Sequence, residues 1–527
     1  MTSTAFVFDT CSRHRTKGTP MQDASLQTAV SYQYKNFSCI LCSLLCLNLL
    51  CVTAEARSAG DAAAGHAISD DDISLALEVE PLIDNGIFGE ALARHHSRTA
   101  SQPNIVLLIL DTLRADHVTS ARMPRLHALL QKSLSFERVM AAATSTDHAM
   151  YAMLHMRPAY ERELRWERPW HHGSVALQWL KRAGYSINLF TFPAWYACPP
   201  IASDLQRPAV WGNQSTFELL YQNRGQLLER CPHRLRDQID TTNPYLADAQ
   251  LVGQYLEFLD GERGGRPRFD LVHLYGAHDP YGVSPALDEL CIPSYSLVNS
   301  PRLPASRSRL TDAAEMRGVR NTYINAVRTL DQQVGALIDG LKSRHLYEDC
   351  LIVVASDHGE TLPEPPMNLY GHGLPPTWPQ SDVILSFKFP HQQTPLRRPF
   401  ASSVDLFPTV FAHLGLTTEA GPPFAAGVYG TAAQEPGLHC AICAQPKRSL
   451  PPTCIAVSDG SSKLFLEVAQ RGPDERPTHW RLTKLTDMQD RPLCSQRDIR
   501  AVLRSNPTLK RCLRRMQGPN PTDEMPI

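Results

Sequence analysis

Apolar residues gather in short unbroken runs through the middle of the chain. The clearest runs are residues 104–110, Asn-Ile-Val-Leu-Leu-Ile-Leu, and Leu351–Ala355, each of strand length and without the alternation of a half-buried strand. Strands that are apolar on both faces are typical of a parallel sheet covered by helices on both sides. We predict further strands at Ser186–Phe190, Phe269–Tyr275 and Val383–Phe387, and a short one at Phe136–Met140.

Helical patterns separate these strands. Apolar residues recur at 323, 327, 330, 334, 337 and 341, which predicts an amphipathic helix over Tyr323–Leu341. Shorter helices are predicted at Ser174–Ala183 and Val404–Leu414, each followed by a glycine. The alternation predicts an α/β fold with a mainly parallel central sheet sandwiched by helices. In such folds ligands bind beyond the carboxyl ends of the strands.

An apolar run without a charged residue, Phe37–Ala54, lies near the N-terminus. Such a run is typical of an export signal or a membrane anchor. The small-x-small sequence Ala54-Glu55-Ala56 favours a cleaved signal, whereas the long leader before the run favours a single-pass anchor. We therefore expect export to a periplasm, a secretory lumen or the outside, with the run able to anchor the protein in a membrane.

Changes in composition and residue pattern divide the chain into four parts. Residues 1–56 hold the signal or anchor, and residues 57–101, polar and then acidic, are expected to form a stalk with one docking helix. Residues 102–420 carry the α/β pattern and form the expected catalytic domain. Residues 421–527 are rich in Pro, Gly and Cys and hold two alternating runs, Lys463–Val468 and His479–Leu485. These runs predict a small antiparallel C-terminal subdomain.

Cysteines are concentrated in this C-terminal part. Nine cysteines follow residue 56, and five of them lie beyond residue 439. An exported protein can form disulfides, and a small subdomain gains most from them, although an odd number leaves at least one thiol unpaired. Cys440 and Cys443 are also spaced like a metal or redox pair, but we expect structural disulfides here.

The charge balance excludes one class of partner. The 52 Lys and Arg residues nearly cancel the 53 Asp and Glu residues. Without a net positive field the chain is not expected to bind nucleic acid, because that binding depends on neutralising phosphates. An anionic substrate must therefore be held locally, by a metal ion or by a few placed side chains.

Chemically capable side chains follow three of the predicted strands. Asp111 follows the first strand, Thr146 follows the strand at Phe136–Met140, and Asp357 and His358 follow Leu351–Ala355. Each has a purely structural interpretation, such as a helix cap or a turn. Together they supply the oxygen ligands and imidazole of a divalent-metal site, in which the ion would activate the Thr146 hydroxyl.

Two of these loops carry recognisable motifs. The segment 103–116, PNIVLLILDTLRAD, resembles the opening strand and first metal loop of the alkaline phosphatase and sulfatase superfamily, and SDHGE at 356–360 resembles the second metal loop. The resemblance covers residues 102–416 and implies a divalent ion (Zn, Mn or Ca) and phospho- or sulfo-ester chemistry. It also includes Tyr323, Asn325, Asp331, Tyr370–Gly373 and Ser403–Thr409.

The nucleophile segment departs from that of true sulfatases. Their Cys-x-Pro-x-Arg pattern, from which formylglycine is made, is replaced by Thr146, His148 and Met150. The loop is instead similar to the Thr-containing loops of phosphoethanolamine and glycerophosphate transferases. That similarity implies Asp111, Thr146, Asp357 and His358 as metal ligands and Thr146 as the nucleophile. Met156 stands where relatives have Gly, and Thr112 stands where a second acidic ligand is common.

Two histidines are expected to serve the substrate. His278, in the sequence His-Asp-Pro-Tyr, resembles the family's substrate-side histidine, and His372 resembles its partner near the metal. Either imidazole can hydrogen-bond the leaving oxygen or donate a proton to it.

These residues lead to one function and two alternatives. We expect a metal-dependent hydrolase or transferase of phosphate esters, with a lipid- or glycan-linked ester as one kind of substrate. The alternatives are a sulfuric ester hydrolase that works without formylglycine and a non-catalytic, membrane-tethered binding module that keeps the fold.

Overall fold

The computed structural model describes residues 102–156, 174–191, 244–295, 309–416 and 441–506, apart from short gaps within these ranges, together with Ala159 and Leu509. The apolar run at 37–54 and the expected stalk at 57–101 lie outside these residues. Within the part that is described, no helix has both the length and the hydropathy needed to cross a membrane.

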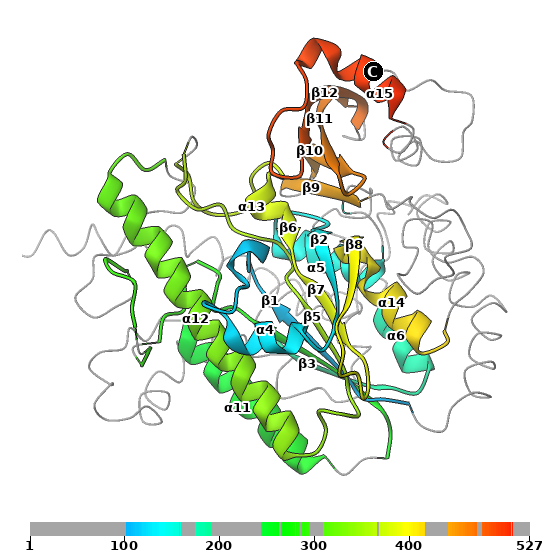
Figure 1. The fold of residues 1–527 in the computed structure, drawn as a ribbon. Coiled ribbons are helices and arrows are strands. Elements are labelled where there is room, and N and C mark those ends of the chain that lie inside the picture. The colour runs from blue at the N-terminus through cyan, green and yellow to red at the C-terminus, as the bar shows by residue number, and fades with distance from the viewer. Residues whose placement is uncertain are drawn as a thin grey trace, which may run out of the picture. The chain divides into compact units, whose positions relative to one another are not determined.

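The centre of the fold is an eight-stranded mixed sheet (Figure 1). Its strands follow the order β3-β4-β1-β5-β7-β2-β6, and β8 pairs with β2. The pairs β3–β4, β4–β1, β1–β5 and β2–β8 are parallel, whereas β7 is antiparallel to β5 and β2. The strands are β1 (Ile105–Leu110), β2 (Leu134–Met140), β3 (Ser186–Phe190), β4 (Arg268–Leu274), β5 (Leu351–Ala355), β6 (Asp382–Val383), β7 (Leu385–Lys388) and β8 (Leu396–Ser402).

Helices pack on both faces of this sheet, as predicted (Figure 1). Alternate residues of β1 enter different cores: Val106 and Leu108 join one buried cluster, and Ile105 and Leu107 join the other. The first cluster packs under α4 (Pro124–Leu130), α11 (Pro244–Gly261) and α12 (Ala313–Ser343). The second packs under α5 (Thr146–His155), α6 (Val175–Arg182) and α14 (Leu406–His413).

Most predicted elements are confirmed. The strands Ser186–Phe190 and Leu351–Ala355 have the predicted bounds. The long helix extends in both directions beyond Tyr323–Leu341, over Ala313–Ser343. Asp312 caps its start by accepting the N–H groups of Ala314 and Glu315.

Two predicted elements have different forms. The prediction of a single strand at Val383–Phe387 is wrong, because the segment forms two strands. Strand β6 pairs with β2, whereas β7 pairs with both β2 and β5. The helix predicted at Val404–Leu414 begins as a 3-10 turn, Ser403–Asp405, before α14. Its first turn is closed by Asp405, which accepts the N–H of Ser402.

The C-terminal part contains a separate four-stranded antiparallel sheet in the order β12-β11-β10-β9. The two predicted alternating runs lie in β11 (Ser462–Arg471) and β12 (Pro477–Asp487), while β9 (Ala441–Lys447) and β10 (Leu450–Ser458) were not predicted. The sheet is followed by a 3-10 turn, Gln496–Asp498, and α15 (Ile499–Ser505).

The expected disulfides are absent where this part is described. Cys443, Cys454 and Cys494 are free thiols, and Cys440 and Cys512 lie outside the described residues. Cys443 and Cys454 are buried in the apolar core beneath the sheet, where they pack as small hydrophobic residues. Burial against apolar neighbours therefore holds these strands together without a crosslink at these positions.

Candidate active site

Three loops meet at one edge of the central sheet. Asp111 follows β1 and Asp357 lies two residues after β5, and these two strands are parallel neighbours. Strand β2 is antiparallel to β7, which is antiparallel to β5, so β2 points the same way as β1 and β5. The loop after β2, which leads to Thr146, therefore opens on the same edge as the two carboxylates.

Thr146 is the first residue of α5 and lies between groups from the other two loops. Its hydroxyl donates to Asp111 Oδ2 at 3.3 Å, and its Oγ1 lies 3.2 Å from His358 Nε2. The side chains of Asp111, Asp357 and His358 are fully buried, while Thr146 is half-buried. The structure thus brings together the four side chains that the sequence suggested as metal ligands.

Asp357 has one oxygen that is held by the backbone and one that is not. Its Oδ1 accepts the N–H groups of Thr112 at 3.1 Å and His358 at 2.8 Å. Its Oδ2 lies 3.5 Å from His358 Nε2 and, like Asp111 Oδ1, is buried without a hydrogen-bond partner. Buried carboxylate oxygens without partners are rare, because desolvation is costly unless a donor or a cation compensates it.

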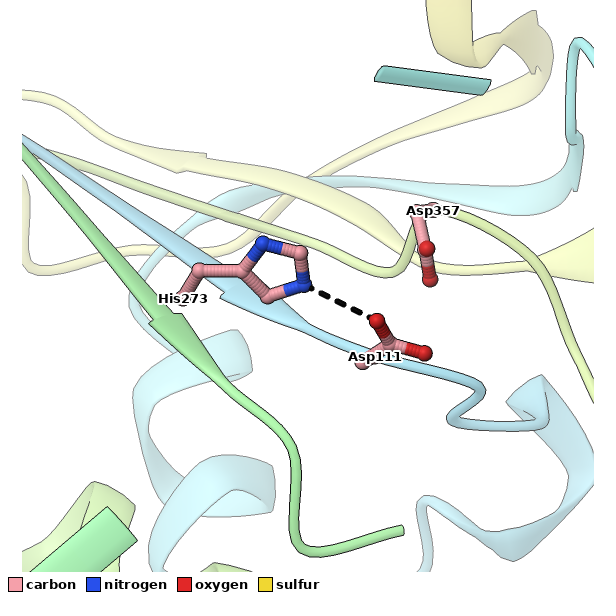
Figure 2. A group of neighbouring side chains, drawn as sticks. All are labelled: Asp111, His273 and Asp357. Atoms are coloured by element: carbon pink, nitrogen blue, oxygen red, sulfur yellow. Dashed lines mark hydrogen bonds and ion pairs between the residues drawn. The ribbon is translucent and has the colours of Figure 1, made fainter. Parts of the chain in front are cut away.

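His273 is a site residue that the sequence analysis missed. It lies within β4, paired in register with Ile109 of β1, and its side chain is fully buried. Its Nε2 is 3.1 Å from Asp111 Oδ2 (Figure 2). One ligand atom each from Asp111, His273 and Asp357 lie within 4.8 Å of one another. Figure 2 shows the three side chains converging from adjacent strands.

The buried carboxylates of Asp111 and Asp357 are unfavourable as anions unless a cation lies nearby. Burial raises the pKa of Asp357, and the negative charge of Asp111 raises it further. Burial also raises the pKa of Asp111, but the hydrogen bond with His273 and the neighbouring imidazoles outweigh this effect and lower the pKa. Two buried carboxylates with unpartnered oxygens, two imidazoles and a hydroxyl fit a divalent metal ion.

Two further histidines continue the site away from Asp111. The ring of His372 lies 4.7 Å from the ring of His358 and 4.7 Å from the ring of His278, measured between centroids. His372 Nδ1 is 3.3 Å from Glu360 Oε2. Burial raises the pKa of Glu360 to about 8, although the imidazoles of His278 and His358 oppose this. The two histidines predicted to serve the substrate are therefore beside the proposed metal ligands.

His278 is carried by a loop with its own support. Asp248 of α11 accepts the N–H groups of Tyr275 and Gly276 through its two carboxylate oxygens, at 2.8 and 2.6 Å. His278 Nδ1 lies 2.6 Å from the carbonyl oxygen of Asp279. Burial lowers the pKa of His278, but the negative charge of Asp111 and the Asp279 carbonyl outweigh burial and raise it.

The unusual residues near Thr146 have structural explanations. Met150 is buried in the core, so it does not face a substrate. His148 Nδ1 lies 2.9 Å from Asp147 Oδ1 and 3.1 Å from Ser145 Oγ, which ties the first turn of α5 to itself. Met156 ends α5 with φ of 56° and ψ of 35°, the left-handed conformation that glycine adopts at least cost.

The loop before Thr146 is held from two sides. On one side Ala444 of β9 donates to the carbonyl of Ala142 at 3.0 Å and accepts the N–H of Thr144 at 3.1 Å. On the other side the N–H of Gly373 donates to the carbonyl of Thr144 at 2.6 Å. The C-terminal sheet and the segment that follows His372 therefore both support the loop that presents Thr146.

Comparison with known proteins agrees with this geometry. The sulfatase family model matches residues 103–416, while no curated protein matches the chain in sequence. The resemblance inferred from the motifs is thereby confirmed.

Solved structures share the fold. The phosphonate monoester hydrolase SpPMH from Silicibacter pomeroyi has a TM-score of 0.57 at 19% identity, covering 80% of this chain and 96% of that one. The phosphonate monoester hydrolase of Agrobacterium radiobacter has 0.56 at 16%, covering 79% and 96%. BT4656, solved with its substrate D-glucosamine-2-N,6-O-disulfate, has 0.56 at 12%, covering 80% and 100%. The chain therefore belongs to the sulfatase family and is an ester hydrolase.

Proposed function

We propose that the protein is a metal-dependent hydrolase or transferase of phosphate esters in which Thr146 is the nucleophile. The observation that carries the proposal is the position of Thr146 Oγ1, 3.3 Å from Asp111 Oδ2 and 3.2 Å from His358 Nε2. A hydroxyl in contact with a carboxylate and an imidazole is oriented by both, and the carboxylate can accept its proton.

The metal centre would be built from Asp111, Asp357, His358 and Thr146. A divalent ion held by these residues would lower the pKa of the hydroxyl and stabilise the anionic oxygens of the ester. The N-terminus of α5, where Thr146 lies, adds the positive end of a ten-residue helix to the same place. The substrate's negative charge is thus held locally, in a protein whose overall charge is close to neutral.

The reaction proceeds in two displacements at phosphorus. Thr146 gives its proton to Asp111 as Oγ1 forms a bond to phosphorus and the bond from phosphorus to the leaving alcohol oxygen breaks. The leaving oxygen takes a proton from His278 or His372. Water then attacks the phosphothreonine at phosphorus and gives a proton to the same histidine, while the Thr146 oxygen leaves phosphorus and takes its proton back from Asp111, which releases phosphate. If an acceptor alcohol replaces water, the same step transfers the phosphoryl-linked group.

The identity of the nucleophile favours phosphorus over sulfur. A formylglycine hydrate has a second hydroxyl on the same carbon, so it can expel sulfate by breaking a carbon–oxygen bond. Threonine has a single hydroxyl, so its ester must be cleaved by a second attack at the central atom. Family membership alone supports the sulfuric ester alternative equally, because the matched family is that of the sulfatases.

The test compares substrates and traps the intermediate. Wild-type protein is assayed in parallel on aryl phosphate, aryl phosphonate and aryl sulfate esters, and intact-protein mass spectrometry follows Thr146 after rapid acid quenching. We expect turnover of a phosphorus ester and a phosphate adduct on Thr146. Thr146→Ala should lose both, whereas Thr119→Ala, which removes an exposed hydroxyl, should lose neither. Undiminished activity in Thr146→Ala would refute the nucleophile, and turnover of aryl sulfate alone would favour the alternative.

A further inference from the structure

His273 is placed to contact the same ion as the two carboxylates. It belongs to strand β4 rather than to a loop. Strand β4 lies between β1, which ends at Asp111, and the edge strand β3. Its backbone pairs in parallel with Ile109 of β1, and the preceding residue, Val272, pairs with Phe190 of β3. The imidazole is therefore held rigidly, as a metal ligand needs to be.

The contacts among His273, Asp111, Thr146 and His358 have the separations of neighbouring ligands in one coordination sphere. His273 Nε2 to Asp111 Oδ2 is 3.1 Å, Thr146 Oγ1 to Asp111 Oδ2 is 3.3 Å, and Thr146 Oγ1 to His358 Nε2 is 3.2 Å. Ligand bonds of about 2.0–2.3 Å put neighbouring ligands about 3.0–3.7 Å apart around an ion. The contact between His273 and Asp111 thus has the length expected for two ligands of one ion.

We propose that His273 Nε2 is a direct metal ligand, which gives the ion two imidazoles, from His273 and His358, and makes the site selective for zinc or a similar transition metal over calcium. Imidazole nitrogen suits zinc and its neighbours in the periodic table, whereas calcium takes six to eight oxygen ligands. The inference rests on the proposed metal-dependent function, and it narrows the metals that the family resemblance allowed.

In the competing arrangement, His273 Nε2 keeps its hydrogen bond to Asp111 and does not bind the metal ion. In that case His273 carries its proton on Nε2 and only orients Asp111, as outer-shell partners of metal ligands commonly do. In the proposed arrangement Nε2 is unprotonated and the proton is on Nδ1. The two arrangements therefore differ in the number of imidazoles bound to the ion.

The experiment counts those imidazoles. Purified protein is stripped with a chelator and loaded with one equivalent of Cu²⁺, and pulsed electron paramagnetic resonance counts the coordinated imidazoles through their remote nitrogens. We expect two in the wild type and one in either His273→Gln or His358→Gln, while His117→Gln, which removes a buried imidazole outside the site, should keep two. A count of one in the wild type would overturn the proposal, even if the variants fail to fold.

A binding measurement tests the selectivity. Calorimetry on stripped protein compares Zn²⁺ with Ca²⁺, and we expect Zn²⁺ to bind at least about 100-fold more tightly. His273→Gln should reduce that ratio by about 10-fold or more, and equal binding of the two ions by the wild type would contradict the inference. The same measurements on Thr146→Ala separate this inference from the proposed nucleophile, since that variant should still bind Zn²⁺ through two carboxylates and two imidazoles.

Discussion

The hydroxyl of Tyr323 donates to the carbonyl oxygen of Thr112 at 2.8 Å and accepts the N–H of Arg114 at 3.0 Å. A fully buried side chain of α12 thereby holds both ends of the turn that follows Asp111. Thr112 has a φ of 55°, which is unfavourable for a β-branched residue, so this turn needs such external support.

Tyr323→Phe is therefore expected to loosen the turn beside Asp111. The change leaves a buried carbonyl and a buried N–H unpaired and should lower the free energy of unfolding by about 1–3 kcal/mol. It should also weaken metal binding, measured by calorimetry. The control is Tyr185→Phe, which removes one hydrogen bond to the carbonyl of Pro103 far from the site. If both variants bind metal equally well, Tyr323 supports only the fold.

Asp331 caps a helix to which it does not belong. Its oxygens accept the N–H groups of Arg125 at 3.0 Å and Leu126 at 2.8 Å, at the start of α4, whose own N-cap residue Met123 provides no side-chain cap. Asp331→Ala should cost about 1–3 kcal/mol of unfolding free energy in urea denaturation. Asp339→Ala, on the exposed part of the same helix, removes only surface ion pairs and should change stability by less than about 1 kcal/mol. Equal losses in the two variants would show that the cap contributes little.

His117 makes stability depend on pH. Its ring is buried edge-on against Tyr323, and burial lowers its pKa from 6.5 to about 3. Below pH 6.5 the unfolded chain binds a proton at His117, whereas the folded chain binds it only below about pH 3. This group therefore lowers the free energy of unfolding as the pH falls from 6.5 to about 3. Its contribution between pH 7 and pH 5 is a loss of about 2 kcal/mol.

The matching variant is His117→Phe, which keeps the ring and removes the titration. Urea denaturation at pH 7 and pH 5 should show a smaller difference for this variant than for the wild type. His391→Gln, which removes an exposed imidazole, should keep the wild-type difference. An unchanged pH dependence in His117→Phe would mean that other groups dominate.

Ala444→Pro tests the support of the Thr146 loop from β9. Proline removes the N–H that Ala444 donates to Ala142 but spares pairing with β10, because adjacent residues of a strand direct their backbone groups to opposite sides. We expect turnover to fall at least about tenfold while metal affinity stays unchanged, since one hydrogen bond of about 1 kcal/mol and an unpaired carbonyl are involved. Ala444→Gly keeps the N–H and should retain activity. Full activity in the proline variant would rule out this support.

The sequence was sufficient for most of the central sheet and for three site loops. Fully apolar runs such as Leu351–Ala355 occur only where both faces of a strand are covered, so they located the buried strands and their carboxyl ends. In the loop that follows β5, a Cβ on Gly359 would lie 2.0 Å from the carbonyl oxygen of Pro379, so close packing requires a glycine at this position. Local pattern and motif pointed to the same residues.

His273 could not be predicted from the pattern, because strand β4 also holds two other polar residues, Arg268 and Asp270. Asp270 is equally buried, but it accepts from Asn188 at 2.8 Å and from Tyr255 at 3.2 Å and belongs to the structure. Only the register with β1 shows that His273 lies beside Asp111. A histidine within a predicted strand was the available signal, and it does not distinguish a structural role from a role in the site.

The C-terminal strands were missed for a related reason. Strand β10 begins Leu-Pro-Pro and β9 contains Pro446, and proline normally argues against a strand. The prolines of β10 fall where its register with β9 is irregular, between Leu450 and Cys454, and β9 is at the edge of its sheet. Both are places where a sheet tolerates proline.

The hydrogen bonds between Ala444 and the loop before Thr146 also limit how far the chain can be shortened from its C-terminus. The family match ends at residue 416, yet β9 lies beyond it and pairs with Ala143 in the matched region. A chain cut at that boundary would leave the carbonyl of Ala142 and the N–H of Thr144 open to other molecules, and unpaired strand edges promote aggregation. The shortest soluble form of this enzyme should therefore be longer than the part by which its family is recognised.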